Sequence, residues 1–174
     1  VVKSANDVAV AVAEHIGGTE YQFARLMTER ANAIGMTSTI FRNASGLPNP
    51  AQRSTARDMA MLGLRLQDDF PQYYRSFPTP SFTFRGKTYK SHNTLMRGFP
   101  GMDGIKTGYT CASGYNLVAS ATRNGRKLIA VILGETSSNA RTARAAALLE
   151  SGFRTREWKS AFPIARVENY PSQV

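Results

Sequence analysis

The sequence predicts an α+β fold in which helices cover both faces of an antiparallel sheet. Three segments carry apolar residues at helical spacing: 20–34, 55–70 and 137–153. Within 115–135, two strand-like runs flank Asn124-Gly125, a dipeptide that favours the type I′ turn of a β-hairpin. Because the helices precede and follow the strands instead of alternating with them, the order is typical of an α+β fold.

Two helices are expected near the start of the chain. Residues 8–16 fit either a strand or a helix, because valine alternates with alanine there. The alanine content and the preceding Asn6-Asp7 favour a helix that is capped at that point. The second helix, 20–34, is followed by Gly35, where a left-handed C-terminal cap is expected.

A long loop separates these helices from the third. Residues 37–53 are rich in turn-forming residues and predict a loop. The helix over 55–70 has Ser54 or Thr55 as its cap and Pro71 just beyond its end.

Short strands are expected in the second half of the chain. Residues 81–89 read as two strands around Arg85-Gly86-Lys87, and 93–104 reads as a glycine-rich loop. A further strand over 104–112 precedes the 115–135 hairpin and completes a three-stranded sheet.

Composition limits the class of protein. The chain has 174 residues, of which 42% are hydrophobic, which suits one domain with a real core. The net charge is +10, but the basic residues are scattered, so we expect no nucleic-acid partner. A single cysteine, Cys111, excludes an intrachain disulfide and a multi-cysteine zinc site, and it is expected to be a small buried residue.

Two short motifs can carry chemistry once common alternatives are removed. The sequence has no Gly-x-Ser-x-Gly, no phosphate-binding Gly-x-x-x-x-Gly-Lys-Ser/Thr and no His-Glu-x-x-His. Ser4-Ala5-Asn6 and Lys106-Thr107-Gly108 remain. Each is weak alone, since Ser4 and Asn6 could simply cap a helix and Lys106 could be a solvated lysine at the start of a strand.

In this order the two motifs match the second and third motifs of the penicillin-recognising serine enzymes, Ser-x-x-Lys, Ser-x-Asn and Lys-Thr-Gly. The segments "SANDVAVAVAEHIGGTEYQFARLMTERANAIGMTST", "STARDMAMLG", "DGIKTGYT" and "ASGYNLVASATRNGRKLIAVILG" resemble the low-molecular-mass penicillin-binding proteins, the D-alanyl-D-alanine carboxypeptidases of serine peptidase family S11. The resemblance covers residues 1 to about 155.

The resemblance implies a β-lactamase/transpeptidase-like fold and a serine D,D-carboxypeptidase. Such an enzyme removes the terminal D-alanine from peptidoglycan stem peptides ending in D-Ala-D-Ala, by acyl transfer to water through a serine ester. β-Lactam antibiotics would be ligands, with no cofactor and no metal. The expected location is extracytoplasmic, in the periplasm or cell envelope, with any membrane association made through a segment outside this chain.

The resemblance also implies roles for the first motif and for the motif lysine. Ser4 would pass a proton toward the leaving amine, and Asn6 would bind the peptide carbonyl and orient the catalytic lysine. Lys106 would place a positive charge beside the D-alanine carboxylate. These three are the expected catalytic residues.

Four further residues are expected to bind substrate. Thr107 would donate its hydroxyl hydrogen bond to the carboxylate, and Gly108 would let a peptide approach the strand edge closely. The Tyr109 N–H would be one oxyanion-hole donor, although the family often has histidine at that position. Arg141 would help to bind the carboxylate.

The nucleophile is not in this sequence, because no serine has a lysine three positions later. The family carries Ser-x-x-Lys upstream of Ser-x-Asn. We therefore expect 1–155 to be the C-terminal portion of a catalytic domain whose N-terminal portion is absent, and 156–174 to be a tail or linker. The absent portion would be a structural partner, and the chain alone would be inactive.

Other functions remain open at this point. A class A β-lactamase needs a deacylating glutamate on a loop between the motifs, and the loop 43–53 has none. A non-catalytic module that binds cell wall, or a scaffold fragment of the same fold, is the main alternative.

Overall fold

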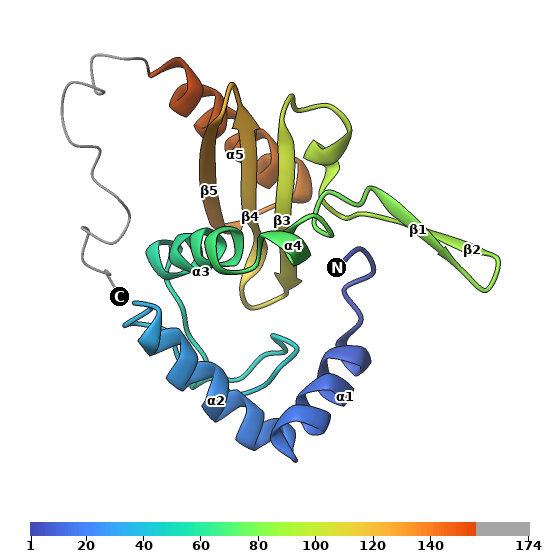
Figure 1. The fold of residues 1–174 in the computed structure, drawn as a ribbon, viewed down its shortest axis with the longest axis vertical. Coiled ribbons are helices and arrows are strands. Elements are labelled where there is room, and N and C mark those ends of the chain that lie inside the picture. Colours follow the sequence, from blue (N-terminus) through green and yellow to red (C-terminus); the bar gives the residue numbers. More distant parts are fainter. Residues whose placement is uncertain (156–174) are drawn as a thin grey trace.

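A three-stranded antiparallel sheet forms the centre of the computed structural model, which describes residues 1–155. Its strands lie in the order β3-β4-β5 (Figure 1). Asn124 and Gly125 have φ of 51° and 76°, the left-handed values that a type I′ turn needs, so the predicted hairpin is confirmed. The strands are β3 (Met102–Thr110), β4 (Gly114–Arg123) and β5 (Arg126–Glu135).

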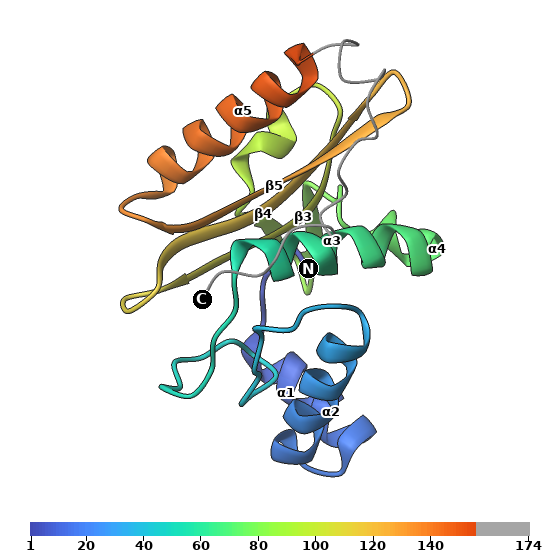
Figure 2. The same cartoon turned by 90° about the vertical axis from the view of Figure 1, so that its left-hand side faces the viewer.

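Helices cover both faces of this sheet, as the sequence predicted. α5 (Ser138–Arg154) lies on one face and α3 (Ala56–Asp69) on the other (Figure 2). Thr55 caps α3, because its side chain accepts a hydrogen bond from the Asp58 N–H. A methyl group added at Gly63 would lie 3.0 Å from the Ile105 side chain, so glycine lets α3 approach the sheet closely. The core between α5 and the sheet contains Leu117, Ala119, Ala121, Ile132, Ala145 and Leu149.

α1 (Asn6–Gly17) and α2 (Glu20–Ala33) form a pair set apart from the sheet (Figures 1 and 2). The helix predicted over 8–16 is confirmed, but its predicted cap is wrong. Ala5 occupies the N-cap position, and no side chain caps the helix. Gly35 has φ 89°, which confirms the left-handed end expected after the second helix.

The predicted loop over 37–53 is held by a contact within itself and by hydrogen bonds to α3. An isolated bridge pairs Ile40 with Arg53. Asp58 on α3 is fully buried and accepts hydrogen bonds from the Ser38 N–H (2.9 Å) and the Thr39 hydroxyl (2.7 Å). These bonds hold the loop against α3, whose other side packs on the sheet.

A second, two-stranded sheet projects from the molecule. It consists of β1 (Ser81–Phe84) and β2 (Lys87–Lys90), which were predicted, and it extends away from the three-stranded sheet (Figure 1). The segment 93–104 is not only a loop, since it contains a 3₁₀ turn, η1 (Thr94–Arg97), and the start of β3. The Asn93 side chain caps this turn by accepting from the Leu95 N–H.

Pro71 follows α3 as predicted, but it also begins a short helix, α4 (Pro71–Tyr74). A proline is tolerated in a first helical turn, because the N–H that it lacks would have no intrahelical partner there. The tail expected over 156–174 lies outside the described residues.

Candidate active site

A cavity of about 410 Å³ lies where the start of the chain meets the end of β3. It gathers residues that are far apart in the sequence. Six of the seven predicted site residues line it: Ser4, Asn6, Thr107, Gly108, Tyr109 and Arg141. The remaining lining residues, which the sequence did not indicate, are Lys3, His92, Tyr115 and Ser138.

Ser4 and Asn6 reach this cavity because neither caps α1. The N-cap of the helix is Ala5, and it makes no side-chain hydrogen bond, so the interpretation of these residues as helix caps is wrong. Ser4 has φ 56°, a left-handed conformation that is uncommon for residues with a side chain. Backbone of this kind costs about 1–3 kcal/mol and tends to cluster at functional sites.

The other wall of the cavity is the edge of the sheet. Within the described chain β3 pairs only with β4, with Thr107 opposite Leu117 and Gly108 opposite Asn116. The outer edge of β3 therefore offers backbone N–H and C=O groups to an extended peptide. A methyl group added at Gly108 would come no closer than 3.9 Å to any neighbour, so the described fold does not itself require glycine there.

Lys106 is the exception among the predicted residues. It lines a neighbouring, mainly apolar cavity of about 380 Å³, which shares Thr107 and Gly108 with the first. Its Nζ donates a hydrogen bond to the Thr107 carbonyl oxygen at 2.5 Å. Burial lowers the pKa of Lys106, and the positive charge of Arg141 lowers this pKa further.

Arg141 is 4% exposed and has hydrogen-bonding capacity to spare. Its Nη2 donates to the His92 carbonyl oxygen (3.3 Å) and to the Ser138 hydroxyl (3.0 Å). Its buried Nε has no partner among the described residues. Burial lowers the pKa of Arg141, since water no longer solvates the charge fully. A buried cation with an unpaired donor favours an anionic ligand.

Two tyrosines complete the wall beside Arg141. Tyr109 and Tyr115 lie opposite each other on β3 and β4, with ring centroids 4.3 Å apart. The Arg141 guanidinium lies 5.9 Å from the centre of the Tyr115 ring. Tyr115 was missed because only the register of β3 against β4 places it there, whereas Ser138 could have been found from its i, i+3 spacing to Arg141 in a predicted helix.

A polar network surrounds Asp103, which lies on β3 three residues before Lys106 in the sequence. Asp103 accepts hydrogen bonds from the hydroxyls of Ser120 (2.5 Å) and Thr122 (2.6 Å) on β4. The Tyr74 hydroxyl continues the network to Ser120 and also accepts from the Gln67 amide (2.9 Å). Burial raises the pKa of the Tyr74 hydroxyl, so it stays protonated. The network ties β3 to β4, α3 and α4 close to the cavity.

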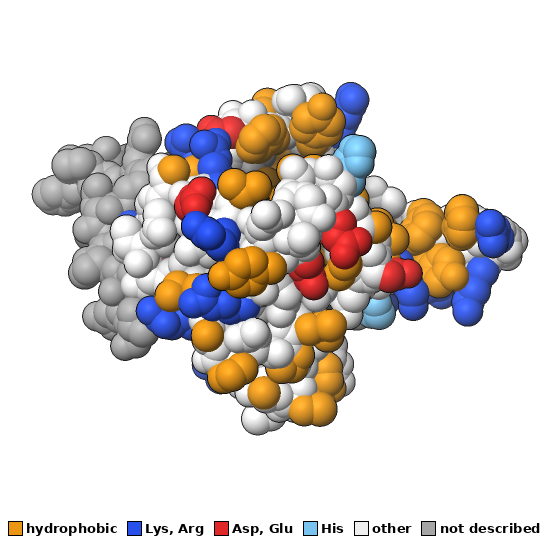
Figure 3. Space-filling view, turned by 90° about the horizontal axis from the view of Figure 1, so that it is seen from below, with side chains coloured by type: hydrophobic (Ala, Val, Ile, Leu, Met, Phe, Trp, Pro, Cys, Tyr) orange, Lys and Arg blue, Asp and Glu red, His pale blue; other side chains and the backbone are white. Residues whose placement is uncertain are grey.

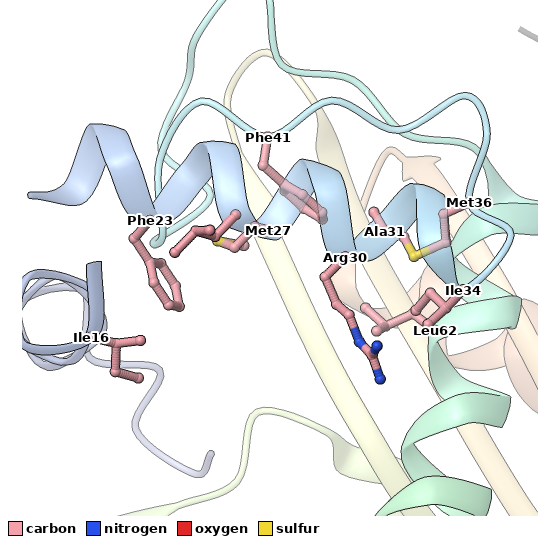
Figure 4. Close-up of a pocket in the computed structure, with 10 residues that line it drawn as sticks. Ile16, Phe23, Met27, Arg30, Ala31, Ile34, Met36, Phe41 and Leu62 are labelled. Carbon is pink, nitrogen blue, oxygen red and sulfur yellow. The ribbon is translucent and has the colours of Figure 1, made fainter.

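An apolar groove runs beside α2 and has a volume of about 340 Å³. Figure 4 shows Phe23, Met27 and Arg30 on α2 facing Ile16 of α1 and Leu62 of α3 across it. Met27, Phe41 and Leu62 also line the apolar cavity at Lys106, so the groove and that cavity adjoin. Ile16 and Leu26, which line the groove, are 61% and 47% exposed, and apolar side chains gathered in this way favour an additional packed segment.

Two negative findings and one correction concern residues 1–155. No group of three or more His, Cys, Asp or Glu side chains in this range is placed to hold a metal ion. No helix in the range is long and apolar enough to cross a membrane. Cys111 is exposed, so its predicted burial is wrong, because β3 ends at Thr110 and leaves Cys111 in the turn before β4.

The α+β fold, with Ser4 and Asn6 of Ser-x-Asn sharing a cavity with Thr107 and Gly108 of Lys-Thr-Gly, defines the class of the penicillin-recognising serine enzymes. The model of the family Peptidase S11, described as D-alanyl-D-alanine carboxypeptidase, matches residues 1–137. The chain belongs to this family.

Curated relatives agree with this assignment. D-alanyl-D-alanine carboxypeptidase DacC of Escherichia coli is 40% identical over 155 residues, which cover 88% of this chain and 39% of the relative. DacA of the same organism is 40% identical over 166 residues, which cover 95% and 41%. The chain thus spans about two fifths of the length of these relatives.

Solved structures show the same fold. The carboxypeptidase DacD of Francisella tularensis superimposes with a TM-score of 0.84 at 32% identity, over 88% of this chain and 50% of that one. Penicillin-binding protein 5 of Haemophilus influenzae gives a TM-score of 0.82 at 38% identity, over 86% and 44%. Penicillin-binding protein D2 of Listeria monocytogenes, solved with cefotaxime bound, gives 0.82 at 31% identity, over 88% and 63%.

Proposed function

We propose that this chain supplies the substrate-binding part of a serine D,D-carboxypeptidase that removes the terminal D-alanine from peptidoglycan stem peptides. One observation carries the proposal: Ser4 and Asn6 share a cavity with the Thr107–Tyr109 strand edge and with a buried arginine. The reaction would proceed through a serine acyl-enzyme that water hydrolyses.

The carboxylate of the substrate would bind between Arg141 and Thr107. The hydrogen bonds that Arg141 makes within the described residues use only Nη2, so its guanidinium keeps donors from which a carboxylate oxygen in the cavity would accept a charge-assisted hydrogen bond. The Thr107 hydroxyl would donate a second one. The charge of Lys106 on β3 adds to the positive potential of Arg141 and would further favour binding of the carboxylate.

The peptide would lie along the outer edge of β3. Since the fold itself leaves room for a side chain at Gly108, the glycine is best explained by the close approach of a ligand backbone. The Tyr109 N–H would contribute to the oxyanion hole, where one donor contributes about 3–4 kcal/mol to the transition state. A backbone donor tolerates tyrosine where the family often has histidine.

Ser4 and Asn6 would act on the other side of the scissile bond. Ser4 would pass a proton toward the leaving amine as general acid, and Asn6 would bind the peptide carbonyl and orient the catalytic lysine. Both side chains are exposed at the cavity and free of helix capping. The strained backbone at Ser4 supports a functional reason for its position.

The proposed reaction requires a nucleophile from outside these 174 residues, because no Ser-x-x-Lys occurs among them. We propose that 1–155 form the C-terminal portion of the catalytic domain and that 156–174 are a tail or linker. The segment bearing Ser-x-x-Lys would pack in the apolar groove beside α2, which leads to Lys106. A peptidoglycan substrate places the protein outside the cytoplasm, in the periplasm or cell envelope.

β-Lactam antibiotics are proposed as ligands of the same site. Penicillin-binding protein D2 of Listeria monocytogenes was solved with cefotaxime and with ampicillin bound. β-Lactams also carry a carboxylate, which Arg141 and Thr107 would bind as they bind the terminal D-alanine.

Labelling with fluorescent penicillin, followed by a denaturing gel, tests the proposal. We expect a covalent band from the intact gene product that carries this chain and none from the 174-residue chain alone. A stoichiometric band from the chain alone would show that the nucleophile is within it. If the intact gene product does not label, the alternative of a non-catalytic module that binds cell wall or acts as a scaffold is supported instead.

A further inference from the structure

The projecting hairpin carries aromatic side chains along one face. The register pairs Phe82 with Tyr89 and Phe84 with Lys87, and side chains alternate between faces along a strand. These four residues therefore share a face, which we call the aromatic strip. Phe82 and Phe84 are 39% and 58% exposed, although exposed phenylalanines gain nothing from contact with water.

Cations accompany the rings along the strip. The Lys87 Nζ lies 5.6 Å from the centre of the Tyr89 ring, and the Arg85 guanidinium lies 5.4 Å from that of Phe84. At exposed sites such cation–π contacts contribute about 0.5–1 kcal/mol each. Figure 3 shows hydrophobic side chains on the projecting hairpin with lysine and arginine side chains around them.

The hairpin also lies in the longest stretch of the sequence without an acidic residue. From 70 to 102 the sequence has no aspartate or glutamate and five basic residues: Arg75, Arg85, Lys87, Lys90 and Arg97. A surface with exposed rings and uncompensated positive charge is complementary to a partner that combines apolar faces with carboxylates.

Lys3 connects the strip to the candidate active site. Its Nζ lies 5.3 Å from the centre of the Tyr89 ring, while the same residue lines the cavity of Ser4 and Asn6. The strip is therefore continuous with the cavity and leads outward from it to Arg85 at the hairpin turn. A ligand that binds in the cavity and continues beyond it would meet the rings and cations next.

We propose that the aromatic strip binds the saccharide–peptide polymer to which the substrate peptide belongs, so that the enzyme prefers peptidoglycan to free peptides. This inference rests on the proposed function. The apolar faces of sugar rings would stack on Phe82 and Phe84, and carboxylates of neighbouring stem peptides would approach Lys87 and Arg85. A lipid surface fits less well, because the hairpin turn, Arg85-Gly86, has no apolar side chain to enter a bilayer.

Two matched double variants of the intact gene product test the inference by co-sedimentation with purified peptidoglycan sacculi. The first, Phe84→Ala with Lys87→Gln, changes one directly opposed cross-strand pair on the aromatic strip. The second, Ser81→Ala with Lys90→Gln, changes the opposed pair on the other face and removes the same charge. We expect the first to weaken binding to sacculi about tenfold and the second less than twofold.

The outcomes separate this inference from the proposed function. Equal losses in both variants, or no loss in the first, would overturn the aromatic strip as a binding surface. The inference would also be overturned if the first variant lost co-sedimentation with anionic phosphatidylglycerol vesicles but kept its binding to sacculi. A first variant that is less stable but binds sacculi as well as the unaltered protein would overturn it too. Penicillin labelling of the unaltered protein reads the proposed function separately, because it does not involve the hairpin.

Discussion

Replacing Arg141 by glutamine tests the proposed carboxylate site most directly. Glutamine keeps an amide donor near the Ser138 hydroxyl and the His92 carbonyl oxygen but removes the charge. We expect the catalytic efficiency, kcat/KM, of the intact gene product on a peptide ending in D-Ala-D-Ala to fall about 30- to 150-fold.

This magnitude follows from the surroundings of Arg141. Its side chain is 4% exposed, so solvent screens its charge weakly. Because Nη2 is already bonded within the fold, the substrate gains mainly one charge-assisted hydrogen bond from the rest of the guanidinium and the local field. A charge-assisted bond at such a site contributes about 2–3 kcal/mol, and each 1.4 kcal/mol is tenfold.

The next turn of α5 offers a matched control. Arg144 carries the same charge but is 67% exposed, with Glu135 as its ion-pair partner. Exposed pairs contribute about 0–1 kcal/mol to stability, and Arg144 does not line the cavity, so Arg144→Gln should change kcat/KM less than twofold.

A second substrate separates charge recognition from general damage. If Arg141 binds the terminal carboxylate, Arg141→Gln should have little effect on a peptide whose carboxylate is replaced by an amide. Equal losses for both peptides, or equal losses in the Arg141 and Arg144 variants, would refute the carboxylate role.

Three further predictions concern pH dependence and stability. Because burial lowers the pKa of Lys106, its charge is lost at a lower pH than that of an ordinary lysine, and kcat/KM should fall as the pH rises through this pKa. In Lys106→Arg the pH profile should show this fall at higher pH, because arginine keeps its charge. A profile that does not move would exclude Lys106 as the origin of the fall. Asp58→Ala should reduce the free energy of unfolding in urea by about 3–5 kcal/mol, because the Ser38 N–H and the Thr39 hydroxyl lose their buried acceptor. A reduction below about 1 kcal/mol would contradict this. Gly101→Ala should lower the thermal midpoint markedly, because its φ is 79° and the new methyl would lie 2.2 Å from the Thr122 carbonyl oxygen; calorimetry showing no shift would disprove the clash.

The sequence predicted those parts of the fold that local patterns determine. The Asn124-Gly125 turn, the left-handed Gly35 and the Thr55 cap follow from the conformational preferences of single residues. The cap of α1 was predicted wrongly at Asn6-Asp7, because polar residues at a helix start have the same appearance whether they cap the helix or, like Ser4 and Asn6, line a cavity.

Only part of the site could be predicted from the sequence, because some of its residues are brought together by the register of the sheet. Motifs indicated Ser4, Asn6 and the residues of β3, but no pattern shows that Tyr115 lies opposite Tyr109, because strand register depends on the whole sheet. Lys106 was expected in the same cavity as Ser4, yet it lines the neighbouring apolar one. The other residues that line this cavity come from α2, the loop after it, α3, Phe77 and the sheet, and only the assembled fold brings these segments together.

The position of Lys106 suggests how the two parts of the proposed site depend on each other. It lies where the apolar cavity meets the strand edge, and burial already lowers its pKa. A segment packed in the adjoining groove would remove more water from Lys106 and would bring the nucleophile's own lysine toward the same strand. Both effects would weaken the hold of Lys106 on its proton, while a bound carboxylate would strengthen it. Substrate binding and proton affinity are therefore linked at Lys106, and acylation by β-lactams should depend on pH differently from the binding of an uncharged analogue.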